Sequence, residues 1–381
     1  MLASRILLHA STITVTVACV LGIHSARADD LALTEAVTMA GMQLFLDSGA
    51  PGIVIGAVRG DDMVIQGYGE TAPGSGIEPN ERSIFRLASV SKVFAGDVLA
   101  SLAAKGKLSL NDPLSTYAPT NARVQSNGRP ITLLDLATHS AALPRELPNP
   151  DAPPSDNPFS VFDRAYYWHW MGSNKPAYIP GTSTLYSNLG YGLLGDALAK
   201  AGGSNYNTVF TNEIAIPIGL KDTGNELNDD QKKRLMTGLD PFNNPDPNAM
   251  VPEVMYASAG LYSTGEDMVR WMKWHLDGAR QQRGDTLLAH QMWLPYDGLT
   301  SVVGTEVSDA DGMGLGWVVS LPRDGAPLLL GKSGGLGGFM TYVVLSPSRD
   351  LGIFVVANRV SFAMFNGLHS RVRELAAELA R

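Results

Sequence analysis

The strand-forming segments of this chain lie at its two ends, and a long, mostly helical middle separates them. PGIVIGAV and DMVIQGYG flank Arg59-Gly60-Asp61, which predicts a β-hairpin near the start. Four strand-like segments lie in the last hundred residues: GLGWVVSL, APLLLGK, GFMTYVVLS and LGIFVVAN. Turn sequences that begin at Pro322 and Pro347 connect neighbouring segments, so the sheet should be antiparallel. We therefore expect one sheet built from both ends of the chain.

Predicted helices complete this fold class. Residues 31–47 have apolar side chains at helical spacing, and the final twenty residues form a second terminal helix, so both should cover the sheet. A further helix is expected over 89–105, and another begins after Thr264 as its N-cap. The prediction is an α/β (α+β) body with an antiparallel sheet flanked by N- and C-terminal helices. It spans about 29–106 and 256–381, with an inserted, mostly helical subdomain at about 107–255.

The first 28 residues have the layout of a secretory signal peptide. Arg5 precedes the apolar run ILLHASTITVTVACVLGI, and Ala26-Arg27-Ala28 is a small-x-small cleavage site. We expect cleavage after Ala28, a periplasmic location and a single catalytic domain over 29–381. An uncleaved membrane anchor is the alternative, which the polar residues within the apolar run disfavour. Cys19 is the only cysteine and would leave with the signal, so no disulfide or thiol chemistry is expected.

Composition limits the partners. The mature chain would carry 27 basic and 37 acidic residues, a net charge of −10 with neutral histidine, because Arg5 and Arg27 leave with the signal. Such an acidic surface argues against nucleic acid or anionic lipid as the main partner, and membrane association should be peripheral at most. No cluster of His, Asp and Glu residues has metal-ligand spacing, so we expect no metal and no cofactor.

The sequence Gly331-Lys332-Ser333-Gly334-Gly335 fits three motifs. A phosphate-binding loop would need a glycine at position 326, where the chain has alanine, and a helix after the serine. A nucleophile elbow also needs a following helix, but the next segment, GFMTYVVL, is strand-like. The remaining interpretation is the end of an inner strand in a serine acyl-transfer site. There Lys332 and the Ser333 hydroxyl can hold a substrate carboxylate, and Gly334 leaves room for it.

Ser89-Val90-Ser91-Lys92 supplies a nucleophile and a base. At a helix start, Ser89 and Lys92 lie three residues apart on one face. A serine hydroxyl needs a base to take its proton, and a neutral lysine can do so once burial and nearby positive charge have lowered its pKa. Val93 and Phe94 beside Lys92 are consistent with burial.

Tyr186-Ser187-Asn188 supplies a second candidate base. A tyrosine phenol beside lysine ammonium groups is shifted toward phenolate, which can accept a proton from serine or water. Asn188 can accept a hydrogen bond from Lys92 and donate one to a substrate amide carbonyl. Either Tyr186 or Lys92 could take the proton from Ser89.

These three motifs occur in an order that resembles the class C β-lactamase and low-molecular-mass penicillin-binding protein family. The resemblance runs from residue 31 almost to the end and is closest to the AmpH-type D-alanyl-D-alanine carboxypeptidase/endopeptidases. It includes RLASVSK, KLSLNDPLSTYAP, PITLLDLATHSAALPRE, YSNLGYGLLGDAL, GLYSTGEDMVRWM, GLGWV and KSGGLGGFMTY. It implies a β-lactamase/transpeptidase-like fold and a serine D,D-peptidase that acts on peptidoglycan stem peptides and is acylated by β-lactams.

The resemblance also implies roles for individual residues. Ser89 would be the acylated nucleophile, Lys92 and Tyr186 would share the base role, and Asn188 and Lys332 would orient the substrate. The backbone N–H groups of Ser89 and Gly335 would form the oxyanion hole.

Two positions depart from the family pattern. Ser333 stands where threonine is usual, which keeps the hydroxyl. Glu146 stands where class C β-lactamases generally have glutamine, in the loop that lines the substrate amide. A carboxylate there should disfavour an anionic neighbour, so we expect inefficient cephalosporin hydrolysis.

Other activities of the same fold are kept as alternatives. They are a class C β-lactamase, an esterase or D-aminopeptidase, and a penicillin sensor that is acylated without turnover. His139, in ATHSA, is interpreted as structural, since no carboxylate is placed to orient it.

Overall fold

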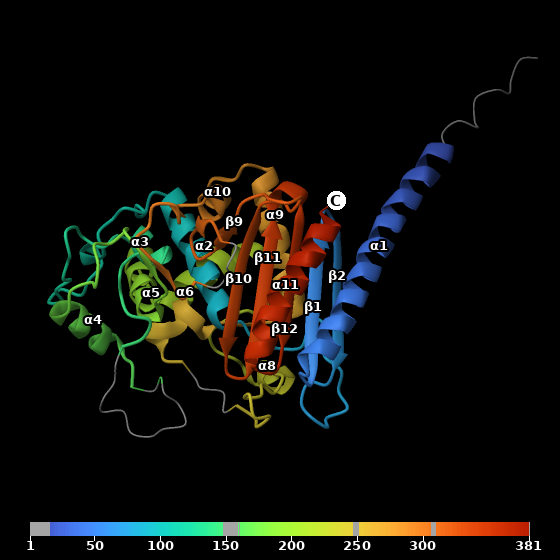
Figure 1. Ribbon diagram of the computed structural model, residues 1–381, viewed down its shortest axis with the longest axis horizontal. Coiled ribbons are helices and arrows are strands. Elements are labelled where there is room, and N and C mark those ends of the chain that lie inside the picture. Colours follow the sequence, from blue (N-terminus) through green and yellow to red (C-terminus); the bar gives the residue numbers. More distant parts are fainter. Residues whose placement is uncertain (1–15, 148–158, 160, 247–250, 306–309, 381) are drawn as a thin grey trace, which may run out of the picture.

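The computed structural model describes residues 16–147, 159, 161–246, 251–305 and 310–380. Its main sheet has eight strands in the order β2-β1-β12-β11-β10-β9-β8-β6, and each neighbouring pair is antiparallel (Figure 1). Because β1 pairs with β12, with Ile53 opposite Ala357, the two ends of the chain share one sheet, as predicted. The strands are β1 (Gly52–Arg59), β2 (Asp62–Gly69), β6 (Leu294–Pro295), β8 (Gly312–Met313), β9 (Val318–Ser320), β10 (Leu329–Leu336), β11 (Phe339–Ser346) and β12 (Leu351–Ala357).

Helices α1 (Thr16–Ser48) and α11 (Phe362–Leu379) cover one face of this sheet (Figure 1). Alternate residues of β1 pack beneath them, so that Ile53 and Ile55 join Val37 of α1 and Val372 of α11 in one buried cluster. This arrangement follows from the two-residue period of a strand, which sends every second side chain to the same face. The two predicted terminal helices are confirmed, although α1 begins before residue 31.

The predicted cleavage point after Ala28 lies within α1, and residues 1–15 of the predicted signal lie outside the described residues. In the part of the chain that the structure describes, no helix combines the length and apolarity that spanning a bilayer requires. Export of the protein stays a prediction.

The opposite face of the sheet packs against α9 (Gly265–Arg280), and α2 (Ser91–Ala104) contacts α9 in turn. Val54 and Phe354 of the sheet join Met272 of α9 in a second buried cluster. The Trp271 ring of α9 stacks on Phe94 of α2, with ring centroids 4.4 Å apart. This second core therefore continues from the sheet into the helical part of the chain.

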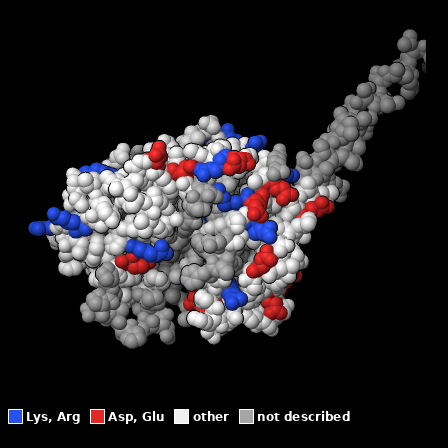
Figure 2. All heavy atoms as spheres, in the orientation of Figure 1, with Lys and Arg blue, Asp and Glu red and all other residues white. Residues whose placement is uncertain are grey.

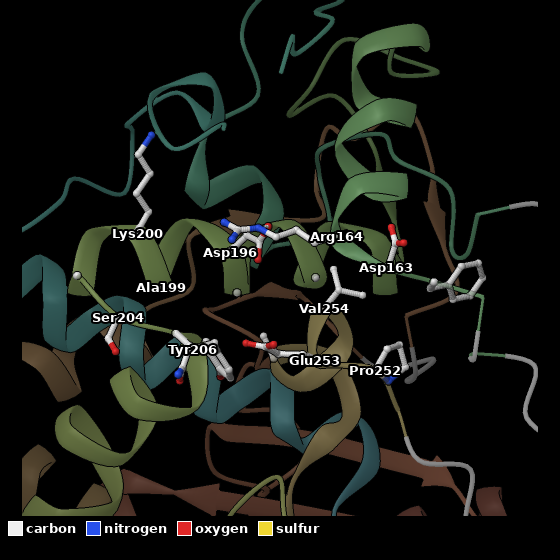
Figure 3. Close-up of a pocket in the computed structure, with 16 residues that line it drawn as sticks. Asp163, Arg164, Asp196, Ala199, Lys200, Ser204, Tyr206, Pro252, Glu253 and Val254 are labelled. Atoms are coloured by element: carbon white, nitrogen blue, oxygen red, sulfur yellow. Dashed lines mark hydrogen bonds and ion pairs between the residues drawn. The ribbon is translucent and has the colours of Figure 1, made fainter. Parts of the chain in front are cut away.

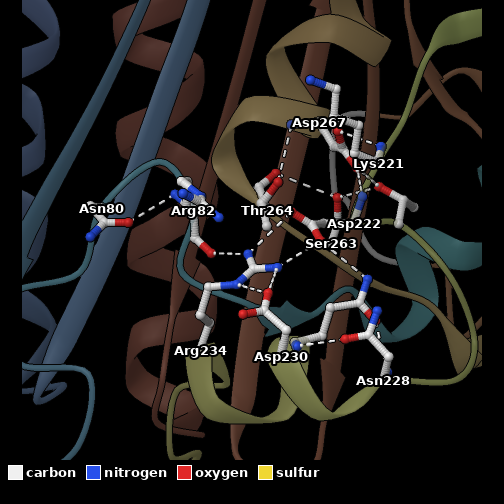
Figure 4. Close-up of polar contacts among 12 residues, drawn as sticks. Asn80, Arg82, Lys221, Asp222, Asn228, Asp230, Arg234, Ser263, Thr264 and Asp267 are labelled. Atoms are coloured by element: carbon white, nitrogen blue, oxygen red, sulfur yellow. Dashed lines mark hydrogen bonds and ion pairs between the residues drawn. The ribbon is translucent and has the colours of Figure 1, made fainter.

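A polar network fixes the N-terminus of α9 (Figure 4). Thr264 is the N-cap, as predicted, and its side chain accepts the backbone N–H of Asp267 at 3.2 Å. The Asp267 carboxylate accepts the backbone N–H groups of Lys221 and Asp222 at 3.1 and 2.7 Å. Asp222 accepts from Arg234 Nη2 at 2.7 Å, which ties α8 (Asp229–Arg234) to the same point.

Short helices dominate the described part of residues 107–255. These elements are η2 (Leu114–Thr116), α3 (Leu133–Ala137), α4 (Arg164–Ser173), α5 (Asn188–Gly202), α6 (Tyr206–Phe210), the π-helix η3 (Thr211–Ala215), α7 (Ile216–Ile218), α8 and η4 (Glu253–Met255). Leu189, Tyr191 and Leu194 of α5 are fully buried, and this helix packs against α3, α4, α6 and η4. Other short elements are β3 (Phe85–Arg86) paired with β5 (Tyr262–Ser263), β4 (Thr184–Leu185) paired with β7 (Val302–Val303), η1 (Ala88–Val90), the π-helix η5 (Tyr256–Gly260), α10 (Gly284–His290) and η6 (Pro347–Arg349).

One strand prediction was too long. GLGWVVSL was expected to be continuous, but β9 contains only Val318–Ser320 of it. Gly316 has a φ of +83°, and Gly314 N–H donates to the Trp317 carbonyl at 2.8 Å. The resulting turn separates β8 from β9. It depends on Gly316, because only glycine adopts such a φ without strain.

Candidate active site

Ser89 lies in a tight turn between β3 and α2. The predicted helix does begin here, but its first turn is the 3₁₀ segment η1, and α2 itself begins at Ser91. Ala88 has a φ of +49°, a left-handed conformation that costs an ordinary residue about 1 kcal/mol. The neighbouring backbone holds this turn, since Leu87 N–H donates to the Leu261 carbonyl at 2.8 Å. Ser89 itself is half-buried.

Lys92 is fully buried and close to Ser89. Its Nζ donates to Ser89 Oγ at 3.2 Å, to Asn188 Oδ1 at 2.6 Å and to the Ser258 carbonyl at 2.8 Å. Three acceptors match the three N–H groups of an ammonium, which is the pairing a buried charge requires. This geometry can therefore hold Lys92 as a cation beside Ser89.

Tyr186 is the second group in contact with Ser89. Its Oη lies 2.8 Å from Ser89 Oγ, and its side chain is buried. Three cations surround its ring, with Arg145 Cζ, Lys92 Nζ and Lys332 Nζ at 4.7, 4.9 and 5.4 Å from the ring centroid. Positive charge at this range favours the phenolate over the neutral phenol, so Tyr186 is placed to accept a proton from Ser89.

Asn188 is the first residue of α5 and connects Lys92 to Glu146. Its Oδ1 accepts from Lys92, and its Nδ2 donates to Glu146 Oε1. Glu146 is half-buried, and Oε2 has no hydrogen-bond partner among the described residues. Burial raises the pKa of Glu146, while the hydrogen bond from Asn188 and the positive charges of Lys92 and Arg145 oppose this shift. Glu146 thus fixes which end of the Asn188 amide faces Lys92.

Lys332, Ser333, Gly334 and Gly335 lie within β10, not at its end as predicted, because this strand continues to Leu336. Lys332 is buried, and its Nζ donates to the Ser333 carbonyl at 2.9 Å. A Cβ at Gly334 would lie 2.3 Å from the Leu87 carbonyl oxygen and 3.0 Å from Ser89 N. The missing side chain therefore lets β10 pass directly against the turn that carries Ser89.

Gly335 differs from its neighbour. No atom lies within 4 Å of the place where its Cβ would be, so this residue faces open space. The structure thus brings β10, Ser89, Lys92, Tyr186, Asn188 and Glu146 together in one site, which the sequence predicted.

Sequence reasoning missed two contributors to the site. Ser258 acts through its backbone carbonyl, for which no side-chain motif exists. Arg145 was overlooked, although its charge next to Glu146 in the same loop was a usable signal. His139, which was interpreted as structural, has its ring 4.3 Å from that of Tyr186.

A separate cavity of about 580 Å³ lies along α5 (Figure 3). Arg164, Asp196, Tyr206 and Val254 are among its lining residues, and Arg164 Nε pairs with Asp196 Oδ2 at 2.6 Å. None of the predicted site residues lines it. Across the described residues, no group of three or more His, Cys, Asp and Glu side chains could hold a metal ion.

The chain is similar to known proteins over most of its length. The sequence model of the family described as Beta-lactamase matches residues 32–378. The D-alanyl-D-alanine-carboxypeptidase/endopeptidase AmpH of Escherichia coli K12 is 39% identical over 344 residues, which are 88% of this chain and 87% of AmpH.

Solved structures share the fold. A beta-lactamase/D-alanine carboxypeptidase from Yersinia pestis, complexed with citrate, is 34% identical with a TM-score of 0.83, covering 92% of this chain and 99% of that one. A class C beta-lactamase structure is 19% identical with a TM-score of 0.74, covering 92% and 96% of the two chains. The predicted β-lactamase/transpeptidase-like fold is confirmed.

Proposed function

Because the chain belongs to the beta-lactamase family, we propose that it is a serine hydrolase with D,D-peptidase activity, which cleaves the D-Ala–D-Ala bond of peptidoglycan stem peptides. The observation that carries this proposal is the contact of Ser89 Oγ with both Tyr186 Oη, at 2.8 Å, and Lys92 Nζ, at 3.2 Å. A nucleophile in contact with a base and a fixed cation is the arrangement that acyl transfer requires. The 39% identity to a D-alanyl-D-alanine-carboxypeptidase/endopeptidase supports the choice of substrate.

We assign the base role to Tyr186. As an ammonium, Lys92 can donate to all three of its acceptors, and in that state it has no lone pair for the Ser89 proton. The Tyr186 phenolate takes that proton while Ser89 Oγ attacks the carbonyl carbon of the penultimate D-alanine. The C–N bond then breaks, and Tyr186 returns the proton to the departing amine of the terminal D-alanine. Water, activated by Tyr186, then hydrolyses the ester on Ser89.

Substrate binding falls to β10 and Asn188. The pairing of β9 with β10 covers Leu329, Leu330 and Gly331, and β11 pairs with β10 from Leu330 to Leu336. An extended peptide can add to the β10 edge beyond Gly331, with its terminal carboxylate near Lys332. Asn188 Nδ2 has a second N–H besides the one given to Glu146, and this can donate to the substrate amide carbonyl.

The test is incubation of the purified protein with a pentapeptide muropeptide, followed by mass spectrometry. The proposal expects loss of one terminal D-alanine with wild-type protein and none with Ser89→Ala. The same assay on cross-linked dimers shows whether endopeptidase cleavage accompanies carboxypeptidase cleavage. Intact pentapeptide after incubation with folded wild-type protein would reject the D,D-peptidase.

The second candidate is a β-lactamase, which the double description of the Yersinia pestis relative as beta-lactamase/D-alanine carboxypeptidase favours. Both activities acylate a serine and differ in how fast water releases the acyl group. Penicillin hydrolysis that is rapid, alongside unreacted pentapeptide, would favour the β-lactamase. Slow hydrolysis of the acyl group that penicillin leaves on the serine, together with efficient D-alanine release, would favour the peptidase.

The substrate also bears on location. Peptidoglycan peptides lie outside the cytoplasmic membrane, and the signal-like residues 1–28 support export to the periplasm with cleavage after Ala28. The N-terminal sequence of protein recovered from the periplasmic fraction tests this, with Asp29 expected as the first residue. Recovery of the uncleaved chain from the cytoplasm would contradict it.

A further inference from the structure

We propose that His139 is a positioning residue that holds Tyr186 against Ser89, and that it does so as a neutral imidazole protonated on Nε2. This inference rests on the proposed role of Tyr186 as the base. It assigns a function to a residue that the sequence pattern alone left as structural.

His139 contacts three successive residues around the base. Its backbone carbonyl accepts Leu185 N–H at 2.8 Å, and its Nδ1 accepts Ser187 N–H at 3.1 Å. Its ring lies against that of Tyr186, with centroids 4.3 Å apart and an interplanar angle of 32°. Tyr186 is therefore held through the backbone of the residues before and after it, and by contact with one face of its ring.

The surrounding fold fixes His139 in turn. It follows α3 with a φ of +58°, a left-handed conformation in which histidine is enriched over most other residues. Its backbone N–H donates to the Leu136 carbonyl at 3.3 Å. Its ring also lies 5.0 Å from that of Tyr191, whose hydroxyl donates to the Ala137 carbonyl at 2.7 Å. His139 is 1% exposed, so its ring is enclosed by the protein.

The hydrogen bond to Ser187 decides the tautomer. A backbone N–H can only donate, so Nδ1 must present a lone pair and the ring proton must lie on Nε2. Nε2 has no hydrogen-bond partner among the described residues. Protonation of Nδ1 would break the contact with Ser187 and place another positive charge beside the ring of Tyr186.

The charges around His139 oppose that protonation. Burial lowers its pKa well below the usual value, and the positive charges of Lys92 on α2, Lys332 on β10 and Arg145 in the loop after α3 lower it further. Tyr186 and Tyr191 are the titratable groups whose rings face it. The cations that favour the Tyr186 phenolate thus also keep the ring of His139 neutral.

Two substitutions separate positioning from simple packing. His139→Asn keeps an acceptor where Nδ1 lies and tolerates a positive φ, but it loses the ring. His139→Phe keeps a ring against Tyr186 and loses the acceptor, which leaves Ser187 N–H unpaired. Melting temperature and circular dichroism report folding in both variants.

The readouts are D-alanine release and the rate at which a labelled penicillin acylates Ser89. We expect His139→Phe to lower kcat and the acylation rate by about 100-fold with KM within about threefold, the scale of a misplaced general base. His139→Asn should recover most of that loss, and only His139→Phe should shift the acid limb of the kcat/KM profile. Penicillin acylation needs no D,D-peptidase activity, so it tests His139 even if the proposed substrate is wrong.

Either of two results would overturn the proposal. Both variants matching wild type in rate and pH profile would show that His139 positions nothing, and parallel losses of rate and melting temperature in both would show a packing role alone. ¹⁵N-histidine NMR tests the tautomer directly. It should show an unprotonated Nδ1 and a protonated Nε2 from pH 5 to pH 8, and a ring that titrates within this range would contradict the account.

Discussion

The amide oxygen of Asn188 lies 2.6 Å from the ammonium nitrogen of Lys92. This contact joins the first residue of α5 to the first turn of α2, and so links the helical insert to the segment that carries Ser89. Asn188→Ala would remove one acceptor from the buried amino group of Lys92 and a donor to the substrate. We expect kcat/KM for D-alanine release to fall about 100-fold.

The control for this prediction is Asn228→Ala, which removes an asparagine N-cap at α8, away from Ser89. It should lower the melting temperature slightly and leave kcat/KM unchanged. Equal activity of Asn188→Ala and wild type would show that the Lys92 contact is dispensable.

Gly334 and Gly335 give a matched pair of substitutions in β10. A Cβ at Gly334 would meet the Leu87 carbonyl oxygen at 2.3 Å and push the strand away from Ser89. A Cβ at Gly335 meets nothing within 4 Å. Gly334→Ala should therefore slow penicillin acylation about 100-fold, the cost of a displacement near 1 Å, and Gly335→Ala should change it little. Stopped-flow acylation rates check this, and similar rates for the two variants would be inconsistent with the packing described.

Glu146 makes stability depend on pH. Its pKa is higher in the fold than the usual 4.5, mainly because of burial. A carboxyl whose pKa is raised on folding contributes stability below its unfolded pKa, and this contribution is lost as pH rises through the folded pKa. Glu146→Gln keeps an acceptor for Asn188 and cannot ionise. Its free energy of unfolding should therefore not show this loss as pH rises.

Urea unfolding of the two proteins at pH 4 and pH 8 measures the difference. The free energy of unfolding of Glu146→Gln relative to wild type should be higher at pH 8 than at pH 4. A difference that is constant with pH, or of opposite sign, would show that burial does not dominate the pKa of Glu146.

Asp267 should be among the residues most important for stability. Its buried carboxylate accepts two backbone N–H groups and the Thr223 hydroxyl, the last at 2.8 Å. Asp267→Ala leaves the two backbone N–H groups unpaired and should lower the free energy of unfolding by about 3 kcal/mol. The exposed Asp229, 3.4 Å from Lys232, is the matched control, and Asp229→Ala should cost little. Thermal and urea unfolding compare the two, and equal losses would contradict this assignment.

Local patterns predicted the parts of this fold that depend on neighbouring residues. The β1–β2 hairpin follows from alternation around Arg59-Gly60-Asp61, and the shared face of Ser89 and Lys92 follows from a spacing of three. The sheet built from both ends of the chain could also be predicted. The segment between the two groups of strands is mostly helical, so it offers them no other strands to pair with. The same patterns placed Lys332 at a strand end, because a Gly-Gly pair is typical of turns, whereas here it continues β10.

Contacts between distant segments could not be predicted in this way. The Ser258 carbonyl approaches Lys92 across 166 positions of sequence, and any residue type supplies a carbonyl. The contacts of His139 with Ser187 and Tyr186 depend on how the turn after α3 packs against the start of α5. Neither arrangement has a signature in the order of residues.

Formation of an acyl-enzyme on Ser89 is the central claim, and peptide mapping after brief exposure to benzylpenicillin tests it most directly. Trypsin should release Leu87–Lys92, which contains both Ser89 and Ser91. Ser91 is buried, and its Oγ accepts Leu261 N–H at 3.0 Å, so it should not react. The account predicts a fragment spectrum with the intact penicillin mass on Ser89 and none in Ser89→Ala. An adduct on Ser91 or Ser333, or an unmodified wild-type protein that also leaves benzylpenicillin unhydrolysed, would contradict it.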